Sequence, residues 1–172
     1  MASGREPPLP GSDQHARPLV VAADRLAMQI ASVLRAWGMP DDHVTVTVDR
    51  ILYADLRGID SHGCTTLAFY QRLRTDGVLN PRATVAVIRR EGASTLVDGG
   101  GGLGHVPATQ AMELAIETAA EHGLGAAAVR NSGHFGAAGA YAAMAADKGL
   151  IGIAVQDFAR GFDLRMRAQA VD

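Results

Sequence analysis

Apolar residues in the first third of the chain recur at helical spacing, with polar residues between them. Apolar residues spaced three or four positions apart predict a helix over 24–38. Its stripe consists of Leu26, Ile30, Val33, Leu34 and Trp37. A second stripe predicts a helix over 41–56, although the valine-threonine alternation at its start also fits a strand. A third helix is expected from Leu67 to a stop at Gly77.

From residue 84 the pattern changes to short apolar runs that alternate with helical stretches. Two strands, 84–89 and 94–98, flank a Glu-Gly turn and predict a hairpin. A helix is expected to begin at Pro107, which suits a first helical turn, and to stop at Gly123. The remaining expected elements form one crossover unit: a strand over 125–129, a helix over 137–148 and a strand over 150–155. This order predicts an α/β fold with a helical N-terminal lobe.

The same patterns divide the chain into four segments. Residues 1–17 mix proline, glycine, serine and charge, which predicts a disordered tail. A helical lobe is expected over 18–80, and an α/β part over 81–156. The periodic signal fades in the last segment, 157–172, which we interpret as a divergent tail.

Composition restricts the classes of function. A net charge of −2 over 172 residues gives no basic surplus for nucleic acid or an acidic membrane surface. The single cysteine cannot form an internal disulfide and rules out a cysteine-based zinc cluster, so a reducing compartment is the simplest location. No apolar run reaches the roughly 18 residues of a membrane helix, and the N-terminus lacks a signal pattern. We therefore expect a cytoplasmic protein without nucleic-acid or membrane partners.

The polar turn 60–63 places a hydroxyl next to an imidazole. Ser61 could orient His62, and His62 could act as a general acid or base near neutral pH. The alternative is a capping turn, in which Asp60 or Ser61 caps the following helix and His62 is merely exposed. Cys64 could be a nucleophile beside His62, but a single cysteine is more often a small buried hydrophobe.

A second candidate site is the segment 130–136, which reads Arg-Asn-Ser-Gly-His-Phe-Gly. It follows a predicted strand and precedes a predicted helix. Backbone N–H groups at a helix N-terminus, together with Arg130 and two small polar side chains, could hold an anionic or carbonyl-bearing ligand. His134 could carry a proton or donate a hydrogen bond to a cofactor. The alternative is an ordinary strand-to-helix connection.

The glycine run 99–104 formally satisfies the dinucleotide pattern G-x-G-x-x-G. However, two residues separate it from Pro107, and no acidic residue ends a second strand about 20 positions further on. We therefore favour a flexible or tightly packed turn over a pyrophosphate site. His62, His105 and His134 could form a metal site with a carboxylate, but no paired ligand spacing supports one, and we expect no metal.

Several segments, in the same order and spacing, resemble the malate/L-lactate dehydrogenase family, whose cofactor fold is not the Rossmann fold. These segments are 54–63, 77–82, 97–99, 102–104, 111–116, 129–136 and 149–153. The family also contains ureidoglycolate dehydrogenase, sulfolactate dehydrogenase and piperideine-2-carboxylate reductase. The resemblance extends over residues 22–156 and implies the α/β fold of that family.

The resemblance implies an oxidoreductase that transfers hydride between NAD or NADP and a small 2-hydroxy acid, malate-like or lactate-like, or a 2-keto or 2-imino acid. It implies that His62 moves a proton at the substrate, with Ser61 in a relay, and that His134 belongs to the active site. The implied cofactor contacts are His134, Phe135, Gly136, Ala137 and Ala138. Family members are homodimers, so the resemblance also implies a homodimer for a full-length chain.

The chain departs from the family pattern at three places. Thr66 stands where many members have a basic residue, His105 stands where a glutamine usually follows Gly-Leu-Gly, and the pattern is lost after Gln156. Members continue into a large second half that supplies further cofactor contacts. We therefore expect that this chain corresponds to the N-terminal half of a member. An inactive truncated enzyme and a non-catalytic binding or interaction module are the alternatives.

Overall fold

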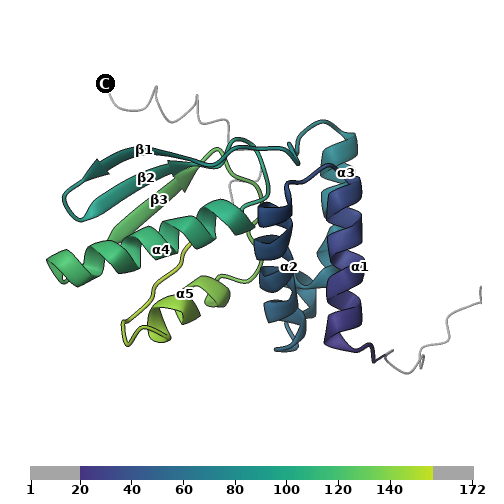
Figure 1. The fold of residues 1–172 in the computed structure, drawn as a ribbon, viewed down its shortest axis with the longest axis horizontal. Helices are drawn as coiled ribbons and strands as arrows, with labels where there is room; N and C mark the ends of the chain where they lie inside the picture. Colours follow the sequence, from purple (N-terminus) through teal and green to yellow (C-terminus); the bar gives the residue numbers. More distant parts are fainter. Residues whose placement is uncertain (1–19, 157–172) are drawn as a thin grey trace, which may run out of the picture.

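The computed structural model describes residues 20–156, and it is an α/β protein whose helical part comes first (Figure 1). Three helices lie together at the end of the molecule opposite the sheet. Their bounds are Ala23–Ala36 for α1, Asp41–Asp55 for α2 and Leu67–Thr75 for α3. These bounds confirm the three predicted helices. The predicted tails 1–17 and 157–172 lie outside the described residues, and the division at residue 80 stays a prediction.

Apolar side chains at helical spacing explain why α2 is a helix. Its buried residues are Val44, Thr47, Ile51 and Ala54. In a strand, Val44 and Ile51 would point to opposite faces, whereas in a helix they share one face. Both belong to a single buried cluster with Ile30 and Leu34 of α1. Removing these side chains from water is the main source of stability for the lobe.

The sheet has three strands in the order β1-β2-β3. Their bounds are Ala86–Glu91 for β1, Ser94–Asp98 for β2 and Ala126–Arg130 for β3. β1 and β2 form the predicted antiparallel hairpin, and β2 pairs with β3 in parallel, with Val97 opposite Val129. The helix α4, His105–His122, connects β2 to β3 and lies along the sheet (Figure 1). Val97, Ala111 and Leu114 are buried between them.

Two sequence predictions for this half are wrong. α4 begins at His105, directly after Gly104, so no residues separate the glycine run from the helix. The predicted strand 150–155 is not formed: after α5, Gly139–Ala146, the structure describes residues 151–156 as chain without strand pairing. The crossover between parallel strands is therefore β2-α4-β3.

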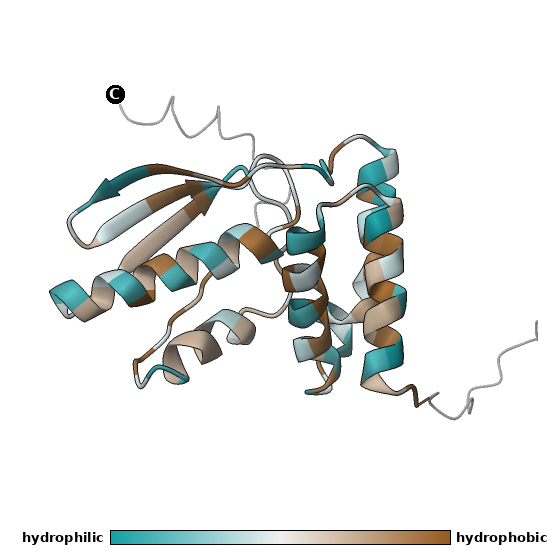
Figure 2. Ribbon diagram, in the orientation of Figure 1, coloured by the Kyte–Doolittle hydropathy of each residue, from teal (hydrophilic) through white to brown (hydrophobic). Residues whose placement is uncertain are grey.

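The segment after α5 has the side-chain pattern of a strand but no partner in the described part of the chain. Ile151 and Ile153 are 94% and 78% exposed, and Figure 2 shows hydrophobic colour along this segment. Gly152 between them is packed, since a Cβ there would lie 2.4 Å from the Ala142 carbonyl oxygen. A period-two pattern indicates that successive side chains point to opposite faces. A strand also needs a neighbouring backbone with which to form hydrogen bonds. Among residues 20–156, no helix has the length and apolar character to cross a membrane.

Candidate active site

The turn that carries Ser61 and His62 is fixed by a carboxylate at the end of α2. Between α2 and α3 the chain forms two 3-10 turns, η1 (Asp60–His62) and η2 (Cys64–Thr66). The Cys64 N–H donates to both carboxylate oxygens of Asp55, at 3.2 and 2.9 Å. A Cβ on Gly63 would lie 1.8 Å from Asp55 Oδ1. Only glycine at this position leaves room for the carboxylate.

Ser61 and His62 are in direct contact, as the sequence suggested. Ser61 Oγ lies 2.8 Å from His62 Nδ1 on the exposed side of η1. No Asp60 or Ser61 side chain caps η1, η2 or the following helix α3, all inside the described range, so the capping alternative is not what the structure contains. The serine hydroxyl is positioned to orient the imidazole, and a hydroxyl can either donate to Nδ1 or accept from it.

His134 lies beside His62, although 72 positions of chain separate them in sequence. The two imidazole rings are stacked, with centroids 5.4 Å apart and an interplanar angle of 29°. Phe69 of α3, which is 41% exposed, meets the His134 ring edge-on at 6.4 Å. The structure therefore brings Ser61, His62 and His134 into one partly exposed cluster.

Two buried residues contact Nδ1 of His134. The Tyr70 hydroxyl lies 2.7 Å from Nδ1, and the Gly136 N–H donates to the same atom at 3.3 Å. Burial, and then the neighbouring His62, lower the pKa of His134 below its ordinary value of 6.5. Burial also raises the pKa of Tyr70 to about 12, against an opposing contribution from Thr66.

The glycine run 99–104 supports the segment that carries His134. Four backbone hydrogen bonds join the two segments: Gly99 N to Arg130 O, Gly101 N to Asn131 O, Gly133 N to Gly102 O, and Gly104 N to His134 O. A Cβ on Gly104 would lie 2.5 Å from the Gly133 carbonyl oxygen. Of the flexible and tightly packed turns that the sequence allowed, the structure contains the tightly packed one.

Asp98, at the end of β2, holds the first residues of the same segment. Its carboxylate accepts from Gly100 N at 2.9 Å, from Arg130 Nε at 2.9 Å and from Asn131 Nδ2 at 3.0 Å. These interactions, the Gly100 hydrogen bond first, lower the pKa of Asp98. Asn131 adopts a left-handed backbone with φ of 49°, which asparagine tolerates better than most residues. Sequence reasoning missed Tyr70 and Asp98, because their partners His134 and Arg130 are distant in sequence. It also missed Asp55, whose partner Cys64 is nine positions away.

The remaining predicted cofactor contacts face partly inward. Gly136 and Ala137 are buried, Ala138 is half-buried, and the Phe135 ring stacks on Tyr141 with centroids 5.0 Å apart. The Tyr141 hydroxyl donates to the Phe135 carbonyl oxygen. This packing fixes the chain that runs from His134 into α5.

His105 and Cys64 have environments that oppose reactive roles. His105 is fully buried below the cluster, and neither ring nitrogen has a hydrogen-bond partner among the described residues. Burial, then His134 and Arg50, lower the pKa of His105 to about 3. Burial and the adjacent Asp55 raise the pKa of the Cys64 thiol, which disfavours the nucleophilic thiolate. Within residues 20–156, no group of three or more metal-ligating side chains could hold a metal ion.

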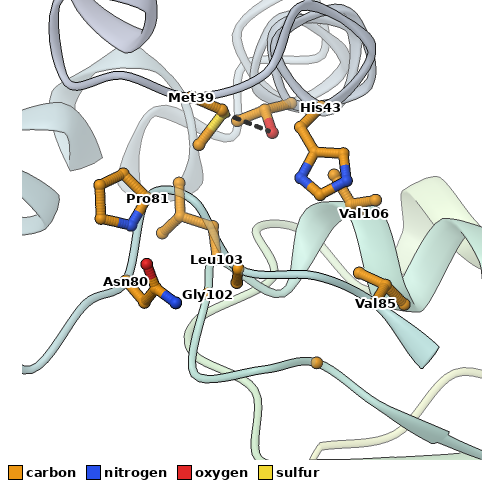
Figure 3. Close-up of a pocket in the computed structure, with 11 residues that line it drawn as sticks. Met39, His43, Asn80, Pro81, Val85, Gly102, Leu103 and Val106 are labelled. Carbon is orange, nitrogen blue, oxygen red and sulfur yellow. Dashed lines mark hydrogen bonds between the residues drawn. The ribbon is translucent and has the colours of Figure 1, made fainter.

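A separate pocket lies on another part of the molecule. Figure 3 shows it between Met39 and His43, at the start of α2, and the loops that carry Asn80 and Leu103. Thr47 and Met39 both line it, and the Thr47 hydroxyl donates to the Met39 sulfur at 3.8 Å. Neither His62 nor any residue of 130–136 lines it, so the candidate active site is the partly exposed histidine cluster.

The sequence of this chain matches one protein family and several of its characterised members. A family model described as malate/L-lactate dehydrogenase matches residues 21–160. Malate dehydrogenase from Pyrococcus abyssi is 41% identical over 135 residues, which are 78% of this chain and 37% of that protein. The alignment thus spans less of the relative than the half expected from the sequence.

Solved structures agree in fold. Malate dehydrogenase from Pyrococcus horikoshii matches with a TM-score of 0.72 and 40% identity, over 76% of this chain and 38% of that chain. Sulfolactate dehydrogenase from Methanocaldococcus jannaschii matches with a TM-score of 0.73 and 34% identity, over the same shares of the two chains. These matches confirm the predicted α/β fold class.

Proposed function

This chain belongs to the malate/L-lactate dehydrogenase family, and we propose that it carries the proton-transfer part of an NAD(P)-dependent oxidoreductase site. The proposed substrates are small 2-hydroxy acids of the malate or lactate type, or the corresponding 2-keto or 2-imino acids. The relatives named as malate and sulfolactate dehydrogenases support this class of substrate. Because the chain spans under two fifths of these relatives, the complete reaction belongs to the proposal as well.

The observation that carries this proposal is the contact between Ser61 Oγ and His62 Nδ1 at 2.8 Å. When Nδ1–H donates to the serine oxygen, Nε2 has a free lone pair and can take the hydroxyl proton of a 2-hydroxy acid. In the reverse direction the imidazolium returns that proton to the oxygen or nitrogen of the product. The Ser61 hydroxyl keeps the ring oriented in both protonation states, because it can accept or donate.

A nicotinamide cofactor, when bound, accepts or supplies the hydride. The exposed edge of Phe69 and the stacked rings of His62 and His134 form an aromatic surface of the kind on which a flat ring packs. The glycine run fits a pyrophosphate poorly, because its N–H groups are used within the chain. These donors are Gly99, Gly100, Gly101, Gly102 and Gly104. We therefore assign the nicotinamide side of the cofactor to the histidine cluster and give the glycine run a supporting role.

Titration of the purified 172-residue chain with NADH and with NADPH tests the proposal through nicotinamide fluorescence. We expect a saturable change that His134→Ala weakens and His62→Ala leaves largely intact. His122→Ala, at the exposed end of α4, is the matched control. No binding at millimolar cofactor would exclude catalysis by this chain alone and would favour the non-catalytic binding module.

Turnover separates the two histidines further. In any preparation that oxidises a 2-hydroxy acid, His62→Ala should abolish turnover, because it removes the imidazole that the Ser61 hydroxyl orients. His134→Ala should lower both turnover and cofactor affinity. Equal activity of His62→Ala and the parent protein would refute the assignment of proton transfer to His62.

A further inference from the structure

The hydrogen bonds at His134 Nδ1 determine which ring nitrogen carries the proton. A backbone N–H can only donate, so the contact of the Gly136 amide, 3.3 Å away, favours a lone pair on Nδ1. The Tyr70 hydroxyl at 2.7 Å must then donate to the same lone pair. With Nδ1 accepting from both, the hydrogen of a neutral imidazole sits on Nε2.

We propose that Tyr70 and the Gly136 amide hold His134 as the neutral tautomer protonated on Nε2, so that Tyr70 is a positioning residue for this histidine. The use of His134 as a hydrogen-bond donor that does not titrate rests on the proposed function, because that function assigns proton transfer to His62 alone. His134 Nε2 then keeps its hydrogen and stays a donor whether or not His62 is protonated.

Tyr70 is suited to this role because it cannot easily turn away. Its side chain is fully buried within the same core cluster as Ile30 and Ile51. Its ring meets His105 at 80° with centroids 5.8 Å apart, which holds it from the side of α4. The raised pKa of Tyr70, about 12, keeps the hydroxyl protonated and therefore a donor at any physiological pH.

The charge environment favours the neutral imidazole that this tautomer requires. Within residues 20–156, the titratable groups that the structure shows facing the His134 ring are His62 from η1, Tyr70 from α3 and His105 from α4. Protonated His62 repels a second positive charge, and burial disfavours it too, so the pKa of His134 is lowered. A neutral imidazole is also the only form that can accept at Nδ1.

The contrast with His62 gives this arrangement a mechanistic meaning. The Nδ1 partner of His62 is a serine hydroxyl, which can reverse its role as the imidazole gains and loses a proton. The Nδ1 partners of His134 include an amide, which cannot reverse. The two stacked histidines thus differ in whether the imidazole can gain and lose a proton.

Histidine side-chain NMR tests this directly on the full chain labelled with ¹⁵N-histidine. Two-bond ¹⁵N–¹H correlations distinguish the tautomers, and a His134→Gln sample assigns the signal. We expect the Nε2–H form of His134 at pH 7. Tyr70→Phe, which keeps the ring, should produce a mixture of tautomers and raise the pKa of His134 toward its ordinary value. Tyr53→Phe, whose hydroxyl donates to Gly139 O instead, is the matched control and should change neither.

The result that would overturn the proposal is an Nδ1–H or doubly protonated His134 at pH 7 in the parent protein. An unchanged tautomer and pKa in Tyr70→Phe would equally remove Tyr70 from the role. If Tyr70→Phe does not fold, the parent spectrum alone still decides the tautomer. Since this measurement needs neither cofactor nor turnover, failed cofactor binding would overturn the proposed function and leave the tautomer result unaffected.

Discussion

The two turns that carry His62 and His134 are stabilised in opposite ways. The first is held by a local contact, from Asp55 to the Cys64 amide nine residues on, and its histidine has a reversible hydroxyl partner. The second is held by backbone hydrogen bonds to the glycine run and by Tyr70, 64 positions away in sequence. His62 therefore lies on the exposed side with an adaptable partner, which suits the proposed proton transfer, whereas His134 lies against buried groups, which suits the proposed fixed donor.

The largest effect is expected from Gly104→Ala, in the second turn. The added Cβ would lie 2.5 Å from the Gly133 carbonyl oxygen and 2.6 Å from the Phe135 Cβ, so it must push two backbone segments apart. Overpacking of this kind costs about 3 kcal/mol of the free energy of unfolding. Urea denaturation measures the loss.

The matched control for Gly104→Ala is Gly139→Ala at the start of α5. A Cβ there meets only the Tyr53 hydroxyl, at 3.9 Å. Alanine is also the better helix former, so this control should be neutral or slightly stabilising. Equal stability of the two variants would show that the glycine run does not support the second turn.

Gly63→Ala, in the first turn, should cost less although its clash is closer. The Cβ would lie 1.8 Å from Asp55 Oδ1, but a carboxylate at the end of a side chain can move where backbone cannot. The expected loss is that of one helix-cap interaction, about 1–2 kcal/mol by urea denaturation. The double variant Asp55→Ala/Gly63→Ala should be no less stable than Asp55→Ala alone. Additive losses would mean that the carboxylate is not what requires glycine.

His105→Gln tests whether the buried imidazole next to the second turn makes the free energy of unfolding depend on pH. The pKa of His105 in the folded chain is about 3, below its ordinary value of 6.5. Between these values the unfolded chain binds a proton that the folded chain does not, so stability falls as the pH drops from 6.5 toward 3. The slope from this group approaches about 1.4 kcal/mol per pH unit. Glutamine should remove that slope, measured by urea denaturation from pH 7 to pH 4, and an identical slope in both proteins would contradict the buried neutral imidazole.

Local contacts explain what the sequence could predict. The stripes of α1 and α2 and the adjacency of Ser61 and His62 depend on residues within a few positions, and all three are confirmed. The Tyr70 hydroxyl contacts His134 across the fold, while in sequence Tyr70 looks like another member of a helical stripe. Likewise 150–155 has strand alternation, but whether it pairs depends on a neighbour that the pattern does not encode.

The start of α4 gives a second example. Pro107 suits the first turn of a helix, yet α4 begins at His105, because Gly104 is held by its hydrogen bond to His134 O and the helix continues directly from it. The proline therefore predicted a helix start two residues after the observed one. The long-range contact that fixed the true start also positions the catalytic candidate His134.

The smallest effect is expected from Asp98→Asn, which removes a charge from the second turn but leaves its backbone hydrogen bonds in place. The folded-state pKa of Asp98 lies below its ordinary value of 3.8, so the carboxylate stabilises the fold at pH 7, and this contribution is lost as the pH falls through the folded pKa. Asparagine should therefore lower the Tm slightly at pH 7, and thermal melts of the two proteins should converge toward the acid limit. The four hydrogen bonds between the glycine run and the His134 segment remain in the variant. A loss as large as that of Gly104→Ala would instead mean that the charges of Asp98 and Arg130 hold the second turn, and that the backbone contacts follow from them.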